Sequence, residues 1–155
     1  MKAVVTYAPG DNRYEDFPMH ELEDGEVLLK VKGCGICAGD LKAFHGGIRV
    51  WGTSEADRYM EPPCIPGHEF YGEVVDIKGE VPGIAIGDDV CAEQVVPCGH
   101  CHFCRTGKYW MCQRSAVFGF KKYANGGFAE YVKLPKAQPE ACSAQELYEG
   151  AECSG

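Results

Sequence analysis

The stretch PCGHCHFCRTGKYWMC, residues 97–112, contains four cysteines in a C-x2-C-x2-C-x7-C spacing. Thiolates two residues apart in a turn can converge on one metal ion while a fourth returns from further along the chain, and zinc favours four such tetrahedral ligands. With no coordination position left for water or substrate, the site would be structural. Its ligands would be Cys98, Cys101, Cys104 and Cys112, and metal binding would contribute roughly 10–16 kcal/mol to folding.

Two alternatives remain open for this loop. An iron–sulfur site is one, because bacterial ferredoxins also begin with C-x2-C-x2-C; there, however, the next cysteine follows after three residues and precedes a proline. Here seven residues intervene, and Gln113 follows Cys112. Four thiols without a metal are the other alternative. His100 and His102 lie inside the loop as further candidate donors, although four thiolates already suffice.

Length, charge and cysteine content narrow the class of protein. A chain of 155 residues predicts one domain. Its net charge of −8, without a basic cluster, argues against nucleic acid and anionic membranes as partners. We see no signal peptide and no apolar run near the ~20 residues of a membrane span, and expect a soluble, cytoplasmic protein. In a reducing compartment, ten cysteines favour metal ligands or buried thiols; a secreted disulfide framework is the alternative.

Most of the chain reads as short strands separated by glycine and proline turns. One short helix is predicted around residues 39–44, ended by His45-Gly46-Gly47. Residues 137–155 have few large apolar side chains and are predicted to be a tail or the start of a connection. The predicted strands cover residues 2–7, 26–32, 69–77, 89–96 and 128–134.

A second group of metal-ligating residues lies upstream of the cysteine loop. KGCGICAGDLKAFHG contains Cys34 and Cys37, and PPCIPGHEFYGEVV contains His68 and Glu69. A thiolate, an imidazole and a carboxylate at the ends of strand-like segments form the ligand set of a catalytic zinc, which keeps one position open.

The segments GICAGD, GHEFYGEVV, GDDV, PCGHCHFC and GGFAEYVKLP, in this order, resemble the catalytic domain of zinc-dependent medium-chain alcohol and polyol dehydrogenases over residues 1–136. The resemblance implies a mainly β (α+β) fold, a GroES-like partly open β-barrel with a zinc-binding lobe. In that family the barrel sits beside a Rossmann domain that binds NAD or NADP, and this chain has no matching segment. KAFHGG, AEQVVPC and GKYWMC are more similar to the polyol and threonine-type enzymes than to the ethanol-type enzymes.

Residue by residue, the resemblance implies two zinc ions per chain. Cys37 and His68 match the first two catalytic-zinc ligands, and Glu69 the adjacent carboxylate that ligates zinc or orients the site. Asp40 matches an aspartate that hydrogen-bonds the histidine ligand. The structural zinc falls on Cys98, Cys101, Cys104 and Cys112. Zinc would favour deprotonation of a bound alcohol near neutral pH, so that hydride can pass to the nicotinamide.

The chain departs from the family pattern at several positions. Gly39 replaces a Ser or Thr whose hydroxyl passes the alcohol proton toward solvent. Lys42 replaces a frequent histidine, which leaves His45 as either a proton-transfer residue or a surface residue at the helix end. Glu149 lies four residues before Cys153, in register with a third zinc ligand, but Gly150 replaces the expected proline.

Two further patterns have competing interpretations. Residues 33–38 satisfy G-x-G-x-x-A after a strand, but a dinucleotide fingerprint opens a full helix within a βαβ unit, and this predicted helix is too short. Trp51, Tyr109 and Trp110 either line a pocket or pack within the domain, and we expect packing.

Together these features predict the catalytic-domain part of an oxidoreductase that oxidises a small polyol or secondary alcohol with NAD or NADP. We expect it to be inactive without the cofactor domain, because the nicotinamide must be held close to the substrate carbon. A full-length form could be a homo-oligomer. The alternative is a non-catalytic zinc-binding module.

Overall fold

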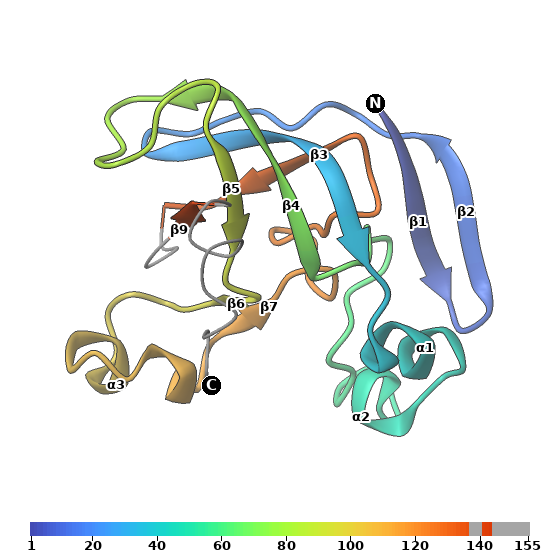
Figure 1. Cartoon of the computed structure of the whole chain (residues 1–155). Helices are drawn as coiled ribbons and strands as arrows, with labels where there is room; N and C mark the ends of the chain where they lie inside the picture. Colours follow the sequence, from blue (N-terminus) through green and yellow to red (C-terminus); the bar gives the residue numbers. More distant parts are fainter. Residues whose placement is uncertain (137–140, 144–155) are drawn as a thin grey trace.

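A five-stranded antiparallel sheet forms the centre of the molecule, and its strands run in the order β8-β3-β4-β5-β9 (Figure 1). The computed structural model describes residues 1–136 and 141–143. The strands of this sheet are β3 (Glu26–Gly35), β4 (Glu69–Lys78), β5 (Asp89–Ala92), β8 (Tyr131–Leu134) and β9 (Ala141–Ser143).

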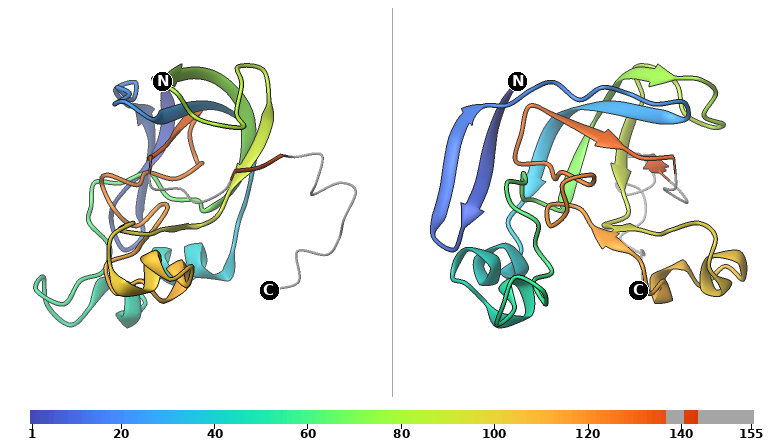
Figure 2. Two further views of the ribbon diagram at one scale, coloured as in Figure 1. Left: turned by 90° about the vertical axis from the view of Figure 1, so that its left-hand side faces the viewer. Right: turned by 180° about the vertical axis from the view of Figure 1, so that it is seen from behind.

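Two smaller pairs of strands flank this sheet. The hairpin of β1 (Lys2–Ala8) and β2 (Asp11–Asp16) lies beside the end of β3, as Figure 1 and the right-hand view of Figure 2 show. The pair of β6 (Val95–Val96) and β7 (Ala116–Val117) closes the base of the cysteine loop. We call residues 97–115, between these two strands, the cysteine lobe.

The helices are short and lie at two separate corners (Figures 1 and 2). Helices α1 (Ala38–Phe44) and α2 (Ile48–Trp51) follow β3, whereas α3 (His102–Arg105) and a 3-10 turn (Tyr109–Met111) lie in the cysteine lobe. Within the described residues, none of the helices is long and apolar enough to cross a membrane.

The main core lies on one face of the large sheet. Alternate side chains of β4 point inward because successive residues of a strand face opposite sides. Phe70 of β4 packs edge-on against Phe118, with ring centroids 5.1 Å apart. A second cluster surrounds Trp51, whose indole N–H donates to the carbonyl of Ala43 at 2.6 Å. Trp51 therefore packs in a core, as the sequence analysis expected.

Three strand predictions and the helix agree with the structure, but two other strand boundaries do not. The predicted strand 89–96 breaks after Ala92, and its second half, β6, leaves the large sheet to pair with β7. In the predicted strand 128–134, β8 begins only at Tyr131. The preceding residues bond to β1 instead: the Val4 N–H donates to the Phe128 carbonyl at 2.8 Å.

Three strands had no counterpart among the predicted strands: β2, the two-residue β7 and β9. The β2 segment DNRYED has no alternating apolar pattern, because it pairs only with β1 in a hairpin that lies outside the main core. Strand β9 pairs with β5 at the edge of the large sheet. Its short segment follows a polar stretch, which carries little strand signal.

Candidate metal centres

The four cysteines of the lobe come together as their spacing predicted. The sulfur atoms of Cys98, Cys101, Cys104 and Cys112 all lie within 4.8 Å of one another. The Sγ atoms of Cys101 and Cys104 are 3.4 Å apart, and those of Cys98 and Cys104 are 3.9 Å apart. Such a cluster has the size and the soft donors of a tetrahedral metal site.

Local backbone structure holds this arrangement. Cys101 caps the first turn of α3, and its sulfur accepts the Cys104 N–H at 3.5 Å. The Cys98 N–H donates to the sulfur of Cys112 at 3.4 Å, which ties the two ends of the lobe together. Hydrogen bonds from backbone N–H groups stabilise thiolate sulfur.

Two of the four thiols have pKa values that shift in opposite directions. The backbone N–H of His100 donates to Cys98 and lowers the pKa of its thiol to about 6. Burial raises the pKa of the Cys104 thiol to about 12, and contact with Cys101 adds to the increase. Negative charges this close together disfavour one another, so a cation among the four sulfur atoms would stabilise their thiolate forms. The cluster therefore fits a divalent metal ion.

The second group of donors also converges. One ligand atom from each of Cys37, His68 and Glu69 lies within 4.8 Å of the other two. Strand pairing explains how distant segments meet: β3 and β4 are antiparallel, and Gly35 lies opposite Glu69. Cys37 follows the end of β3 and His68 precedes the start of β4, so both side chains lie at the same end of the strand pair.

A capping box orients Cys37 and Asp40 at the start of α1. The Cys37 sulfur accepts the Gly39 N–H at 3.2 Å, and the Asp40 carboxylate accepts the Cys37 N–H at 2.9 Å. This reciprocal pattern satisfies two backbone donors that a helix start leaves without partners. Helix formation itself thus points Cys37 and Asp40 to the same side.

Asp40 and His68 face each other in a buried position. The side chains of Asp40 and His68 are only 7% and 5% exposed, and Asp40 Oδ1 lies 3.6 Å from His68 Nδ1. Neither atom has another hydrogen-bond partner, and burying unpaired polar atoms is costly. If Asp40 Oδ1 and His68 Nδ1 moved slightly closer, a hydrogen bond would form between them and fix the orientation of the imidazole ring. The other ring nitrogen, Nε2, would then be free to bind a metal ion, so the residues present fit a catalytic metal.

Gly67 places His68 and must be a glycine. Its φ of +93° lies in the left-handed region that side chains disfavour. A Cβ at this position would also lie 2.6 Å from Phe128 Cδ1 and 2.9 Å from Cys34 Sγ. The His68 ring also packs against the Phe120 ring, with ring centroids 5.7 Å apart.

Comparison with known proteins identifies the fold. Residues 23–143 match the family model described as the alcohol dehydrogenase GroES-like domain. The chain belongs to this family. The match agrees with the GroES-like fold and the dehydrogenase family that the sequence motifs indicated.

Individual relatives of this GroES-like domain carry dehydrogenase names. The chain is 44% identical to the erythritol/L-threitol dehydrogenase of Mycolicibacterium smegmatis over 138 residues, covering 87% of this chain and 38% of that one. It is 36% identical to the L-threonine 3-dehydrogenase of a Chelativorans species over 138 residues, covering 88% of this chain and 38% of that one. The chain therefore spans under half the length of these relatives.

Solved structures give the same result. A protein of Sinorhizobium meliloti described as a zinc-binding dehydrogenase, solved with NADP bound, superposes with a TM-score of 0.75 at 32% sequence identity. The superposition covers 92% of this chain and 37% of that one.

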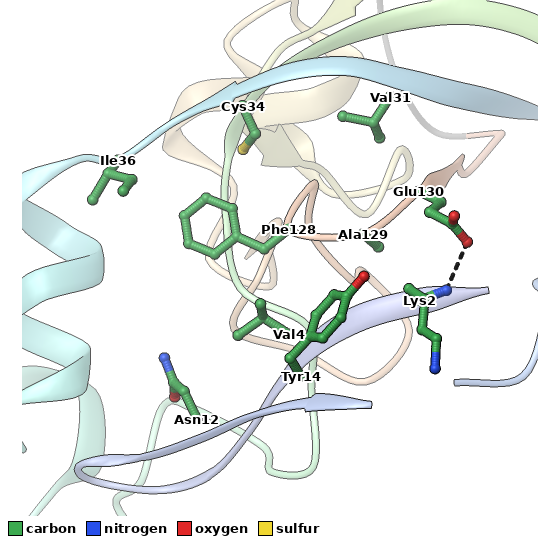
Figure 3. A pocket seen from close by; sticks show the side chains of 10 residues that line it. All are labelled: Lys2, Val4, Asn12, Tyr14, Val31, Cys34, Ile36, Phe128, Ala129 and Glu130. Carbon is green, nitrogen blue, oxygen red and sulfur yellow. Dashed lines mark hydrogen bonds between the residues drawn. The ribbon is translucent and has the colours of Figure 1, made fainter. Parts of the chain in front are cut away.

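Two hollows lie in the GroES-like domain, and one of them borders the second donor group. One, of about 390 Å³, borders His68 and Glu69, and Tyr71, Glu93 and Gln94 form part of its wall. The other, of about 680 Å³, lies beside the β1–β2 hairpin, and Figure 3 shows Tyr14, Phe128 and Cys34 around it. Cys34 is not one of the converging donors, and burial raises the pKa of its thiol to about 11.

The remaining candidates from the sequence occupy varied positions. His45 ends α1 and is exposed, and Lys42 is exposed as well.

Trp110 is 61% exposed, so the expectation that it packs within the domain is wrong. It lies on the 3-10 turn, and its ring meets the Tyr109 ring edge-on. Residues 33–38 run from an antiparallel strand into a short helix, which excludes the dinucleotide fingerprint. Glu149 and Cys153 lie outside the described residues.

Proposed function

We propose that this chain is the catalytic-domain part of an oxidoreductase that oxidises a small polyol or secondary alcohol with NAD or NADP as hydride acceptor. The proposal rests on the convergence of Cys37, His68 and Glu69, together with the buried Asp40 that faces His68. One thiolate, one imidazole and one carboxylate are ligands that catalytic zinc sites use, and such sites leave a position open for substrate.

In this proposal Cys37, His68 and Glu69 hold a catalytic zinc, which would act as a Lewis acid on the alcohol oxygen. Asp40 fixes the orientation of His68 through Nδ1, and the start of α1 fixes Cys37. Glu69 is exposed at the beginning of β4 and completes the described donor set. Glu149 stays a candidate for a further ligand.

The cysteine lobe has a different proposed role. Cys98, Cys101, Cys104 and Cys112 would hold a second, structural zinc, because four thiolates leave no position for a substrate. This ion would stabilise the cysteine lobe, in which α3 and the 3-10 turn are both very short. The chain would then bind two zinc ions with different functions.

The names of the relatives support a polyol as substrate. One relative is an erythritol/L-threitol dehydrogenase, and another is an L-threonine 3-dehydrogenase, whose substrate carries a secondary alcohol. The polar side chains of Glu93 and Gln94 in the hollow beside His68 suit a substrate with several hydroxyls. The nicotinamide cofactor would bind to a separate cofactor domain. That domain would correspond to a part of the relatives outside the segment that matches this chain.

We further propose residues 1–136 as the catalytic domain and residues 137–155 as the connection to the cofactor domain. A cytoplasmic location would keep the thiolate ligands reduced. We also propose that a full-length form of the protein would be a homo-oligomer.

A chimera tests the proposed activity. Residues 1–136 would replace the matching segment of the M. smegmatis enzyme, and formation of NADH or NADPH would be followed with erythritol, threitol and ethanol. We expect turnover with the polyols and little with ethanol. A folded chimera that binds both zinc ions but oxidises no polyol would contradict the proposed function. A chain with one zinc that is insensitive to Cys37→Ser would instead support a non-catalytic zinc module.

Replacing Asp40 should weaken one metal site and spare the other. We expect Asp40→Asn to lower the affinity for the zinc at Cys37, His68 and Glu69 about 10–100-fold, because the amide neither carries the charge nor holds His68 in the same way. Competition with a chromophoric chelator measures both affinities in the isolated chain. Asp76→Asn, at an exposed position of β4, is the matched control and should change neither. Equal affinities in both variants would contradict the orienting role of Asp40.

A further inference from the structure

A third hollow in the described part of the chain is lined by polar side chains. It has a volume of about 120 Å³ and shares no residue with either described donor group. One water molecule in the liquid occupies roughly 30 Å³, so the hollow has room for a ligand larger than a single water. Its walls come from the segment between β2 and β3, the loop after β7, and β8. The lining residues are His20, Glu21, Lys122, Tyr123, Asn125 and Lys133.

His20 contributes a buried ring nitrogen without a partner to this wall. The imidazole hydrogen-bonds the backbone of Tyr131, whereas Nε2 is buried and has no hydrogen-bond partner within the described residues. The bond to Tyr131 therefore uses Nδ1, and it favours the protonated ring, as donation to a carbonyl does. Neutral His20 thus presents a lone pair at Nε2. Burial and the nearby Lys133 lower the pKa of His20 below its ordinary value of 6.5, so the ring is neutral at pH 8.

The other lining groups are mainly hydrogen-bond donors. Lys133 forms an ion pair with the buried Glu26 carboxylate at 2.9 Å and retains ammonium hydrogens for a ligand. The side chain of Lys122 is exposed and adds a second ammonium group. Asn125 uses one amide hydrogen for the Lys122 carbonyl, at 3.2 Å, and retains the other. Tyr123 adds a hydroxyl.

Charge by itself does not select a ligand for this hollow. Lys122 and Lys133 are opposed by Glu21 on the wall and by Glu26, the ion-pair partner of Lys133. The hydrogen-bonding pattern is more selective than the charge. A ligand that satisfies it accepts several hydrogen bonds from the donors and donates one to His20 Nε2, which otherwise stays buried and unpaired at a cost in free energy.

We propose that this hollow is a binding site for inorganic hydrogen phosphate, whose oxygens accept from Lys122, Lys133 and Asn125 and whose hydroxyl donates to His20 Nε2. The inference goes beyond the proposed function and does not rest on it. Inorganic phosphate retains one proton at pH 8. Sulfate retains none, and a phosphomonoester has lost both, because its second pKa is about 6. Neither of these dianions can donate to His20 Nε2.

Nuclear magnetic resonance of the histidine rings tests the proposal. The zinc-loaded chain, labelled with ¹⁵N, would be titrated at pH 8 and constant ionic strength with phosphate, sulfate and methyl phosphate. The His20 signals are those that His20→Gln removes. We expect phosphate to shift the His20 Nε2 signal at about tenfold lower concentration than either other dianion, the effect of one hydrogen bond to an otherwise unpaired acceptor.

Two variants at exposed positions of the wall test the remaining contacts without disturbing the fold. Lys122→Ala removes a donor and should weaken the binding of all three dianions by about tenfold. Glu21→Gln removes the opposing charge and should tighten the binding of all three. Lys108→Ala, at an exposed position of the cysteine lobe, is the matched control and should change none of them.

Three results would overturn the proposal. The first is that phosphate does not shift the His20 signal, or shifts only the His68 signal, which would place phosphate at the metal centre. The second is that all three dianions act at the same concentration, because His20 Nε2 would then select nothing. The third is that Lys108→Ala weakens binding as much as Lys122→Ala, which would indicate general charge screening.

Discussion

Cys104→Ala is expected to remove one zinc ion per chain and to unfold the cysteine lobe. The Cys104 sulfur lies 3.4 Å from that of Cys101 and 3.9 Å from that of Cys98. Loss of one ligand would forfeit much of a binding free energy of roughly 10–16 kcal/mol, which is comparable to the whole stability of a typical domain. Metal analysis and thermal unfolding followed by circular dichroism measure the two effects.

Three other substitutions act as controls for this result. Cys34→Ser removes a thiol outside both donor groups and should leave two zinc ions bound. His100→Ala and His102→Ala should also retain both ions, because four thiolates complete the site. Loss of zinc in either histidine variant would assign that ring as a ligand, and bound iron instead of zinc would support the iron–sulfur alternative.

His68→Ala is expected to remove the other zinc and to abolish turnover in the chimera. A Lewis acid at the alcohol oxygen contributes several kcal/mol to the transition state. Because each 1.36 kcal/mol is a tenfold change in rate, we expect a loss of at least about a thousandfold. The ring is 6% exposed and sits on Phe120, so the alanine variant must be checked for folding by circular dichroism.

His45→Ala is the matched control, because His45 is exposed at the end of α1. It should retain both zinc ions and change turnover less than about threefold, as for other exposed positions. A large loss in His45→Ala with normal zinc content would instead assign it a role in proton transfer. Normal turnover in a folded His68→Ala chimera would contradict the proposed catalytic site.

Much of the fold was predictable because its signals are local. The strand segments near residues 2–7, 26–32 and 69–77 and the helix near residues 39–44 have the expected apolar patterns and turn residues. The errors arose where pairing decides the structure. The segment 89–96 is continuous in sequence but serves two sheets, and the polar β2 is a strand because β1 lies beside it.

The candidate donor residues of both groups stand out in the sequence, with different kinds of support. In the cysteine lobe the spacing alone predicted convergence. For Cys37, His68 and Glu69 the motifs indicated a family, but no local pattern could show that their donor atoms meet. The spatial role of Gly67 was missed, because a glycine in a sequence does not reveal which side chains surround it.

The sequence by itself determined the features that act over a few residues: the thiol cluster of the lobe and the start of α1 at Cys37. Only the tertiary structure decided that His68 and Glu69 lie beside Cys37, and that Asp40 and His68 face each other in a buried position. The physical reason is the antiparallel pairing of β3 and β4. Hydrogen bonds between these strands fix the register that places Gly35 opposite Glu69, and thereby bring distant segments of the chain into one site.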